Sequence, residues 1–349
     1  MIGKAFPSRA TIADVALLAG VSVGTASKAL NGRGQLRDAT RERVHSAAQQ
    51  LGFRPNDLAK SLIRGRTYTV GLLTSDSFGR FSIPVLQGVE DALGAGSIAV
   101  YLCDARGDRI RERHYVDSLL SRRVDGIIVS GRRADPRPPL GTSLPVPVVY
   151  AYSQSTSPED LAVVPDDAHG GRLAAEHVVR AGRRRLAHIT GPARFEAVQL
   201  RWRGARQAAL DGGVDLPGAR VLTGDWSEAW GREAAGLLLA QSPDVDAILC
   251  GNDQIARGVA DALRERGVRV PDDIAIVGYD NWEILAAATR PPLTSVDMGL
   301  EGVGHLAAHL LLARIEGEWE IGVRRLPCTL VVRESSGPVS RRDHSEAGS

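Results

Sequence analysis

The side chains that most often carry covalent chemistry are few in this chain of 349 residues, and their spacing limits the chemistry that they can do. All of the lysines lie within the first 60 residues: Lys4, Lys28 and Lys60. The rest of the chain therefore cannot supply the lysine of a phosphate-binding loop, a Schiff base or a serine–lysine nucleophile pair. The cysteines are far apart and lack C-x-x-C spacing, which argues against a disulfide framework and a zinc site; they are Cys103, Cys250 and Cys328.

The histidines form no catalytic motif either. His305 and His309 are four residues apart, but no glutamate completes H-E-x-x-H and no third ligand is evident, so two ordinary helix histidines are the simpler interpretation. The sequence contains no G-x-S-x-G nucleophile motif, so His169 and His188 have no such serine to activate. The string GVGHLA at 302–307 resembles a dinucleotide-binding fingerprint but lacks the strand and acidic residue that should follow it. We therefore expect no metal, no cofactor and no enzymatic activity.

Charge divides the chain near residue 66. The whole chain carries 43 Lys and Arg against 41 Asp and Glu, a formal net charge of +2. Residues 1–66 hold eleven basic and four acidic side chains, a net +7, which leaves −5 for the remainder. This asymmetry predicts a polyanion-binding module joined to a different kind of domain. Because the remainder is acidic, its arginine runs at 122–123, 132–133 and 183–185 are most simply solvated surface.

Composition indicates a globular protein with more than one domain. The chain is 43% hydrophobic and 24% charged, which is enough to bury substantial cores at this length. Its first residues, MIGKAFPSRA, contain no apolar signal-peptide region, and no run of about 18 apolar residues follows. With the cysteine pattern, this leads us to expect a cytoplasmic protein, neither secreted nor membrane-spanning. The polar end, 336–349, is expected to be disordered.

The polar side chains near the start of the chain lie on short predicted helices. Thr11 followed by Asp14 resembles a capping box, and Gly20 is placed to end the helix that Thr11 begins. Ser22 can cap a second helix over 23–30. Two helices separated by a short turn with glycine are typical of the helix-turn-helix, whose second helix enters the DNA major groove.

Two more helical stretches precede a change of pattern at residue 67. Residues 38–51 place apolar side chains on one face and are followed by Gly52. A second stretch, from Asn56 to about residue 64, is weakly amphipathic and so short that it is marginal in water unless something docks it.

From residue 67 onward, β-branched strands alternate with amphipathic helices. The predicted strands are 68–74, 98–103, 125–130, 146–152, 186–190, 246–250, 273–279 and 329–333. The predicted helices between them are 86–93, 112–120, 170–181, 202–210, 231–240, 255–266 and 301–316. This alternation predicts parallel sheets covered by helices, and its length favours two lobes over one. Ligands of such sheets bind at the carboxyl ends of the strands, here in a cleft between the lobes.

Several strings, taken in order, resemble one known family. They are TIADVALLAGVSVGTASKALNG, LRDATRERVHSAAQQLGFRPNDLAKSL, GPARF, GNDQIARG, DDIAIVGYDN and RPPLTSVD. The chain resembles the lactose-repressor (LacI/GalR) family of bacterial transcription regulators over about residues 11–335. The resemblance implies an all-α helix-turn-helix headpiece at 1–54 and a hinge helix with linker at 55–66. It also implies a two-lobed α/β effector-binding and dimerisation domain, like a periplasmic binding protein with parallel sheets, at 67–335.

The resemblance implies specific DNA-binding residues in the headpiece. It places Val23, Gly24 and Lys28 at base-reading positions, where many relatives carry longer polar side chains at the first two positions and arginine at the third. Gly24 has no side chain to offer, so Lys28 is expected to carry most direct readout. Phosphate-holding or capping positions match Thr11, Ser22, Thr25, Ser27, Asn31 and Arg41. The alternative for Thr25 and Ser27 is that they face solvent or cap the helix.

In the hinge, Asn56, Ala59 and Leu62 match minor-groove positions of the family. Leu62 lies where the family wedges an apolar side chain between base pairs, which unstacks a base step and bends the duplex. The alternative is that Leu62 packs on the body.

The resemblance also implies residues of the effector cleft: Phe81, Arg106, Tyr152, Arg201, Trp226, Asn252, Asp280 and Leu300. Arg201 would hold hydroxyl or carboxylate groups of the ligand, Asn252 and Asp280 would accept from and donate to a polyol, and Trp226 would stack on the apolar face of a sugar. Tyr152 stands where some sugar-binding relatives carry aspartate, so their hydroxyl pattern does not transfer. The alternatives are that Asp280 caps a helix, that Arg201 forms a surface ion pair and that Trp226 is ordinary core.

These observations favour a DNA-binding transcriptional regulator, most simply a repressor. The expected partners are near-palindromic double-stranded operator DNA, a second copy of the chain in a homodimer, and a small effector that is a sugar or sugar derivative; no membrane is expected. Operator binding would associate it with the bacterial nucleoid. An activator or dual regulator of the same family remains an alternative, as does an α/β sugar-binding or sugar-metabolising protein. Whether the effector releases or recruits DNA stays open.

Overall fold

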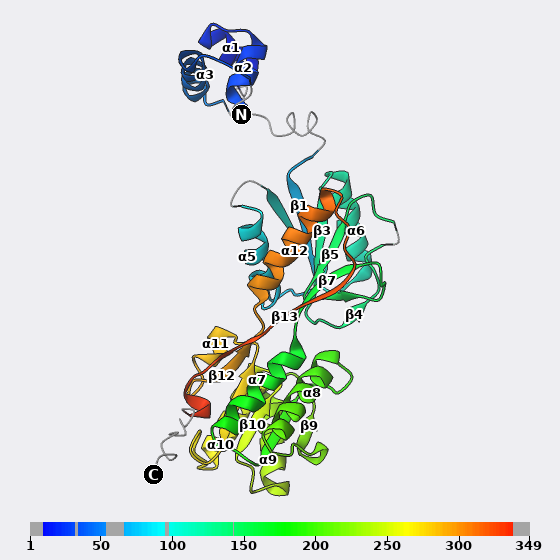
Figure 1. Ribbon diagram of the computed structural model, residues 1–349, viewed down its shortest axis with the longest axis vertical. Coiled ribbons are helices and arrows are strands. Elements are labelled where there is room, and N and C mark those ends of the chain that lie inside the picture. The colour runs from blue at the N-terminus through cyan, green and yellow to red at the C-terminus, as the bar shows by residue number, and fades with distance from the viewer. Residues whose placement is uncertain (1–9, 32–33, 54–65, 95–97, 142, 338–349) are drawn as a thin grey trace, which may run out of the picture. The chain divides into compact units, whose positions relative to one another are not determined.

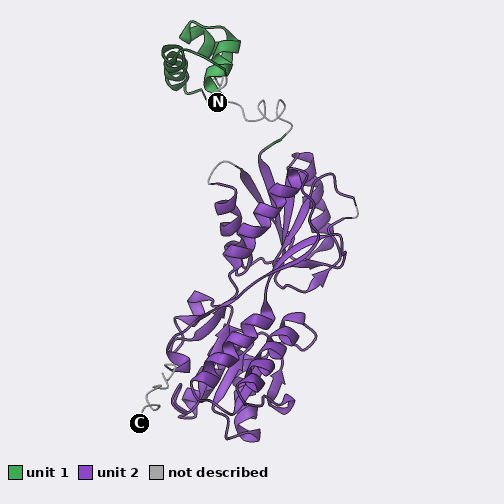
Figure 2. Ribbon diagram, viewed as in Figure 1, with its two compact units in different colours: residues 1–67 green, residues 68–349 purple. Residues whose placement is uncertain are grey.

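The computed structural model describes residues 10–31, 34–53, 66–94, 98–141 and 143–337 and divides into two compact units, 1–67 and 68–349 (Figure 2). This division lies next to the expected boundary between linker and effector domain. The predicted hinge helix, with Asn56, Ala59 and Leu62, lies outside the described residues, as does the chain after residue 337.

The first unit is the predicted helix-turn-helix. Its helices are α1 (Ile12–Ala19), α2 (Val23–Leu30) and α3 (Asp38–Gln50), and α1 and α2 meet at 101° (Figure 1). The Thr11–Asp14 capping box forms, and Gly20 ends α1 in the left-handed conformation at φ 64°. Small apolar side chains from all three helices share one core: Val15, Ala16, Ala19, Ala26, Ala29, Val44, Ala47 and Ala48.

No single helix in the described ranges is both long and apolar enough to cross a membrane. Helices α1 and α2 satisfy that length and composition only when counted together across their bend.

The second unit begins with a lobe built on a six-stranded parallel sheet in the order β13-β7-β5-β3-β1-β2. The strands are β1 (Thr69–Thr74), β2 (Ala99–Asp104), β3 (Gly126–Ser130), β5 (Val148–Ala151), β7 (Leu161–Pro165) and β13 (Gly322–Leu326). Its helices are α5 (Ser82–Ala92), α6 (Arg109–Ser121) and α12 (Leu300–Ile315). A short parallel pair, β4 (Pro136–Arg137) and β6 (Gln154–Ser155), lies beside them.

The second lobe repeats this plan with strand order β14-β12-β11-β10-β8-β9, in which only β14 is antiparallel to its neighbour. The strands are β8 (Leu186–Thr190), β9 (Val221–Thr223), β10 (Ala247–Cys250), β11 (Ala275–Tyr279), β12 (Thr294–Asp297) and β14 (Thr329–Val331). The helices are α7 (Asp167–Arg180), α8 (Glu196–Asp211), α9 (Glu228–Gln241), α10 (Asp253–Glu265) and α11 (Glu283–Ala286), with 3₁₀ turns η1 (Gly218–Arg220) and η2 (Glu334–Ser336).

The chain passes between the lobes three times, which makes each lobe a composite of distant segments (Figure 1). The crossings join β7 to α7, β12 to α12 and β13 to β14. Because α12 and β13 return to the first lobe, residues near 300 and 325 lie with residues near 85 and 163. The two-lobed α/β architecture expected from the sequence is confirmed.

The predicted tail begins too early at residue 336. The Ser336 hydroxyl is buried in η2, 2.7 Å from Nε2 of His177 and 2.7 Å from the Thr294 hydroxyl. These bonds make Ser336 part of the second lobe.

Candidate functional site

The start of α2 presents an exposed, capped helix end. The Ser22 hydroxyl accepts a hydrogen bond from the Thr25 amide at 3.2 Å and lies 2.9 Å from the Thr25 hydroxyl. Val23, Gly24 and Lys28 are exposed, whereas Thr25 and Ser27 are half-buried. The expected base-reading positions therefore lie on the accessible side of the helix. Ser22 is the cap, and Thr25 supplies the amide that Ser22 caps.

Other expected DNA-contacting side chains are already engaged within the headpiece. The Thr11 hydroxyl bonds to Asp14 at 2.7 Å, and the Asn31 amide donates to the Ser27 carbonyl at 2.9 Å. Arg41 is half-buried, and its Nε has no hydrogen-bond partner among the described residues. The hydrogen bonds of Thr11 and Asn31 hold the ends of α1 and α2 within the headpiece.

A cavity of about 710 Å³ lies at the carboxyl ends of the strands of both lobes. It is lined by Asp76, Phe78, Arg80, Phe81, Arg132, Arg133, Ala134, Asp135, Tyr152, Phe195, Ala197, Arg201, Trp226, Asn252, Gln254, Asp280 and Trp282. Six of the eight predicted cleft residues are among them, drawn from segments as far apart as 81 and 280. The mixture of aromatic rings with a few charged groups is typical of a small-molecule site.

Arg201 is a fully enclosed cation at the floor of this cavity, 4% exposed. Its Nε donates to Asp167 at 2.7 Å and its Nη1 to the Gly251 carbonyl at 2.6 Å, while the guanidinium lies 3.6 Å from the centre of the Tyr279 ring. Nη1 also lies 3.9 Å from Asp280. The alternative of a surface ion pair is therefore wrong.

Asp280 follows β11 and is paired across the cleft. Its carboxylate accepts a hydrogen bond from Arg80, a residue of the first lobe whose other nitrogen donates to Gln254 at 2.7 Å. Burial raises the pKa of Asp280, although Arg80 and Arg201 oppose that shift. Asp280 sits at φ 95°, which directs its side chain toward the cavity as the strand ends, and it caps no helix.

Asn252 and Asp253 begin α10 beside Asp280. The Asn252 side-chain oxygen accepts the Ile255 amide at 2.8 Å as the helix cap, which leaves its amide nitrogen as the donor that it can offer to the cavity. Asp253 accepts from the Ser295 hydroxyl at 2.6 Å and from the Trp282 amide at 2.7 Å. Burial, followed by repulsion from Asp280, raises the pKa of Asp253 to about 7.

Aromatic rings line both sides of these charges. Trp226 lies 6.4 Å from Phe195 in a stacked arrangement, and a side chain in place of Gly191 would collide with its indole. On the other side, Trp282 lies 4.6 Å from the Arg80 guanidinium, and Phe81 packs 5.1 Å from Tyr152. Trp226 is only half-buried and lines the cavity, so it is not simply core.

The lobes are also joined by contacts near Glu196, at the start of α8. The Glu196 amide donates to Asp135 at 2.9 Å, and the Gln154 amide donates to the Glu196 carboxylate at 3.1 Å. Arg133 lies 4.4 Å from the centre of the Phe195 ring. Together with Arg80, these contacts bridge the cleft at two places.

Comparisons with known proteins agree with this arrangement. The model of bacterial regulatory proteins of the lacI family matches residues 11–56, and that of the periplasmic binding protein-like domain matches 175–336. The chain is 37% identical over 336 residues to the HTH-type transcriptional regulator CelR of Thermobifida fusca, covering 94% of this chain and 98% of that one. It is 33% identical over 309 residues to the ribose operon repressor of Escherichia coli K12, covering 88% and 93%.

The chain belongs to the lacI family. A solved structure of the lac repressor dimer, bound to operator and the anti-inducer ONPF, matches with a TM-score of 0.77 at 26% identity, covering 95% of this chain and 100% of that one. A CelR–cellobiose complex matches with a TM-score of 0.65 at 34% identity, covering 94% and 100%. As a member of the lacI family, the chain is a DNA-binding transcriptional regulator and not an enzyme.

Two of the predicted cleft residues do not line this cavity. Arg106 is 67% exposed beside Asp104 and does not line the cavity. Leu300 lines a smaller neighbouring pocket instead. Conversely, Arg132 and Arg133, which we interpreted as plain solvated surface, line the cavity at its mouth.

Arg80 and Trp282 were missed by the sequence reasoning. Each follows the carboxyl end of a predicted strand by a few residues, and that position was the one available signal.

We predict that Arg201→Met unfolds at markedly lower denaturant concentration than the natural chain. It leaves Asp167 buried without its cation, which costs about 3–5 kcal/mol for a broken buried pair. Urea unfolding followed by circular dichroism measures the change. Arg269→Met is the matched control, because its pair with Asp273 is 68% and 40% exposed and should matter little. Similar losses in the two variants would contradict this role for Arg201.

Proposed function

We propose that this lacI-family regulator is a homodimeric repressor whose operator affinity is set by a saccharide bound between the lobes. The observation that carries the proposal is the cavity between the lobes that Arg201, Asp280 and Trp226 line together, in the same chain as an exposed helix-turn-helix. The names of the relatives support it: CelR is described in complex with cellobiose, and the lac repressor as a dimer on its operator. Such a repressor would act in the bacterial cytoplasm, associated with the nucleoid through its operator.

On the DNA side, α2 is the helix proposed to enter the major groove. Lys28 donates to guanine O6 or N7, and Val23 offers methyl contact to a thymine. Phosphates are held by Thr11, Ser22, Thr25, Ser27, Asn31 and Arg41, which fix the register of the helix without reading sequence. Asn56, Ala59 and Leu62 are proposed to reach the minor groove, Leu62 as an apolar wedge.

On the effector side, the cavity offers what a polyol needs. Asp280 accepts hydrogen bonds from hydroxyls, and Asn252 donates to them through its amide nitrogen. Trp226 supplies an apolar platform for the C–H face of a sugar ring. Arg201 is largely saturated by its protein partners, so it polarises the floor of the site and holds Asp280 in place.

Binding at this cavity reaches the DNA through the lobe arrangement. A ligand that prefers one arrangement of the lobes shifts the population toward it by its differential affinity alone. A coupling of about 1–3 kcal/mol changes operator affinity by about 5- to 150-fold. Gel shifts with and without the sugar decide whether it releases or recruits DNA.

We predict that Lys28→Ala weakens binding to the specific operator by roughly tenfold to a hundredfold, because it removes the main donor to a base edge. The operator is first selected from a random DNA pool with the natural chain, and affinities are then measured at fixed salt. Arg43→Ala is the control, since Arg43 is an exposed cation of the same headpiece on α3. Equal loss of affinity for specific and random DNA would contradict base readout by Lys28.

We predict that Asp280→Asn weakens saccharide binding by about 10- to 150-fold, the loss expected for a hydrogen bond to a charged acceptor. Calorimetry with the purified protein measures it, and operator affinity without sugar is the second readout. Asp225→Asn tests the same substitution next to Trp226 on an exposed side chain that does not line the cavity. An unchanged sugar affinity in Asp280→Asn would refute the proposed acceptor.

A further inference from the structure

Two histidines of α12 lie outside the cleft and its neighbouring pocket. His305 and His309 occupy successive turns of the helix, and both side chains are exposed. The centres of their rings are 4.5 Å apart, with the ring planes at 63° to each other. Within the part of the chain that the structure describes, neither imidazole forms a hydrogen bond or an ion pair. The spacing alone predicted two ordinary helix histidines, whereas the structure brings their rings into contact.

The backbone beneath these histidines is held in place by the packing of α12 on α5. The two helices approach so closely that a Cβ atom added at Gly88 would collide with the backbone of Glu301 and His305, and one at Gly304 with the backbone of Val85. The opposite face of α12 is buried in the lobe through Val303, Gly304, Ala307, Ala308 and Leu311. The separation of the two histidine backbones is therefore fixed before any ligand binds.

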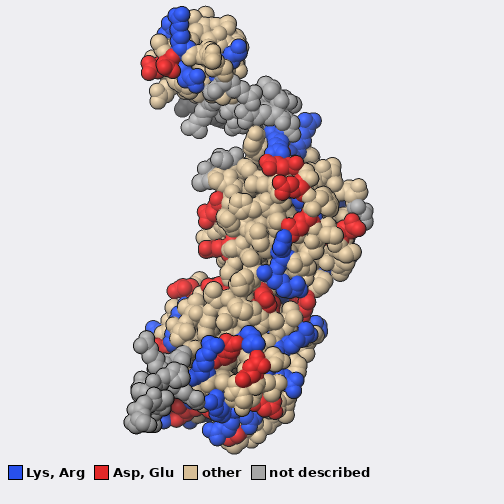
Figure 3. All heavy atoms as spheres, viewed as in Figure 1, with Lys and Arg blue, Asp and Glu red and all other residues tan. Residues whose placement is uncertain are grey.

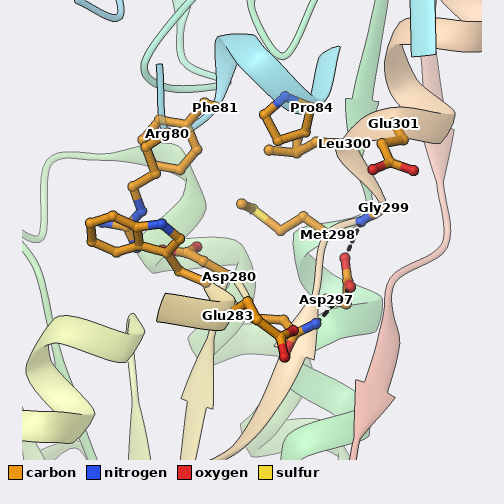
Figure 4. Close-up of a pocket in the computed structure, with 12 residues that line it drawn as sticks. Arg80, Phe81, Pro84, Asp280, Glu283, Asp297, Met298, Gly299, Leu300 and Glu301 are labelled. Carbon is orange, nitrogen blue, oxygen red and sulfur yellow. Dashed lines mark hydrogen bonds and ion pairs between the residues drawn. The ribbon is translucent and has the colours of Figure 1, made fainter. Parts of the chain in front are cut away.

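The pair has the geometry of a two-ligand chelate. Metal–nitrogen bonds of about 2.0–2.1 Å place two ligand nitrogens roughly 3 Å apart, which rings already in contact reach by rotation about their side-chain bonds. Glu301, one turn before His305, lines the smaller pocket at the start of α12 (Figure 4). Among the described residues, no group of three or more His, Cys, Asp and Glu side chains is placed to hold a metal ion. Water or an incoming donor would fill the remaining positions.

The charges of α5 and α12 favour the approach of a cation. Helix α5 contains no lysine or arginine and carries the exposed carboxylates of Glu90 and Asp91. The one arginine of α12, Arg314, is buried and donates to the Val148 carbonyl at 2.9 Å. A metal ion that reaches the histidine pair therefore meets no exposed lysine or arginine on either helix, so that electrostatic repulsion from these helices does not oppose binding.

We propose that His305 and His309 chelate a divalent transition-metal ion that prefers imidazole ligands, namely Cu²⁺, Ni²⁺ or Zn²⁺. Affinity follows the general order for nitrogen ligands, with Cu²⁺ bound most tightly. Mg²⁺ and Ca²⁺ do not bind here, because they need oxygen ligands. The bound ion links two turns of α12 and so stabilises the folded second unit. Neither histidine lines the effector cavity, so this site is independent of the proposed saccharide function.

Calorimetry on the full chain without an affinity tag tests the site, with Cu²⁺, Ni²⁺, Zn²⁺ and Mg²⁺ as separate probes. His309→Ala should weaken Cu²⁺ binding by at least about tenfold, because the second imidazole of a chelate binds within the same molecule. His305→Ala should have the same effect. His114→Ala is the matched control, since His114 is an exposed histidine on α6 of the same lobe, and it should bind Cu²⁺ as the natural chain does.

Two further readouts identify the ligands. Electron paramagnetic resonance of the Cu²⁺ complex should show nitrogen coordination that is reduced in His309→Ala, and Ni²⁺ should raise the unfolding temperature of the natural chain and of His114→Ala but not of His309→Ala. Equal Cu²⁺ affinity in the natural chain and His309→Ala, an equal loss in His114→Ala, or Mg²⁺ binding as tight as that of Cu²⁺ overturns the proposal. None of these outcomes bears on sugar or operator binding, so the proposed function is tested separately.

Discussion

The buried charge of Arg201 is the constraint on which the cleft depends. A guanidinium removed from water needs nearly all of its donors satisfied, and here the partners come from three different elements: Asp167 at the start of α7, Gly251 after β10 and Asp280 after β11. Tyr279 closes the ring of contacts by stacking on the cation and donating to Asp167 at 3.0 Å. One side chain therefore fixes where the strand ends lie relative to a crossing between the lobes.

In that arrangement, the polar groups of the cavity form hydrogen bonds and ion pairs with one another. Arg80 and Asp280 are paired, the Asn252 oxygen caps α10, and Asp253 is enclosed with its pKa raised by burial. A ligand therefore gains binding free energy only where its own hydrogen bonds replace these contacts between protein groups without leaving a buried polar group unsatisfied. Selectivity at such a site comes from the pattern of donors and acceptors more than from the area covered. For the proposed saccharide effector, the aromatic rings would add affinity for the apolar face of the sugar, and the ion pair would select among its hydroxyls.

Much of this could be predicted from the sequence, and the failures have physical causes. The helix-turn-helix followed from caps at Thr11, Ser22 and Gly20, which are local signals. Strands β7, β12 and β13 were missed although β5 and β10 are equally short and were predicted. Polar residues interrupt the apolar pattern of β12 (TSVD) and β13 (GVRRL), and β7 (LAVVP) ends at a proline. Arg106 was misplaced and Arg80 overlooked because both follow strands of the same sheet, and loop conformation decides which of them turns inward. Arg132 and Arg133 show that charge composition alone cannot place a side chain at a cavity mouth.

The helices of the described headpiece carry little of the net positive charge of residues 1–66. In the described headpiece, Lys28, Arg37, Arg41 and Arg43 stand against Asp14, Asp38 and Glu42, so most of the +7 comes from residues that flank it. On the face of the body shown in Figure 3, basic and acidic side chains interleave. The described part of the headpiece is thus nearly neutral, and in the proposed DNA complex the other cations of residues 1–66 would supply most of the attraction to phosphates. If α2 enters the major groove as proposed, Gly24 offers no side chain, so sequence preference would come from few direct contacts and from the deformability of the DNA. Under the proposed function, control through the segment that joins the units would act on the predicted wedge, Leu62, and on the part of the basic charge that lies there: Arg54, Lys60, Arg64 and Arg66 against Asp57.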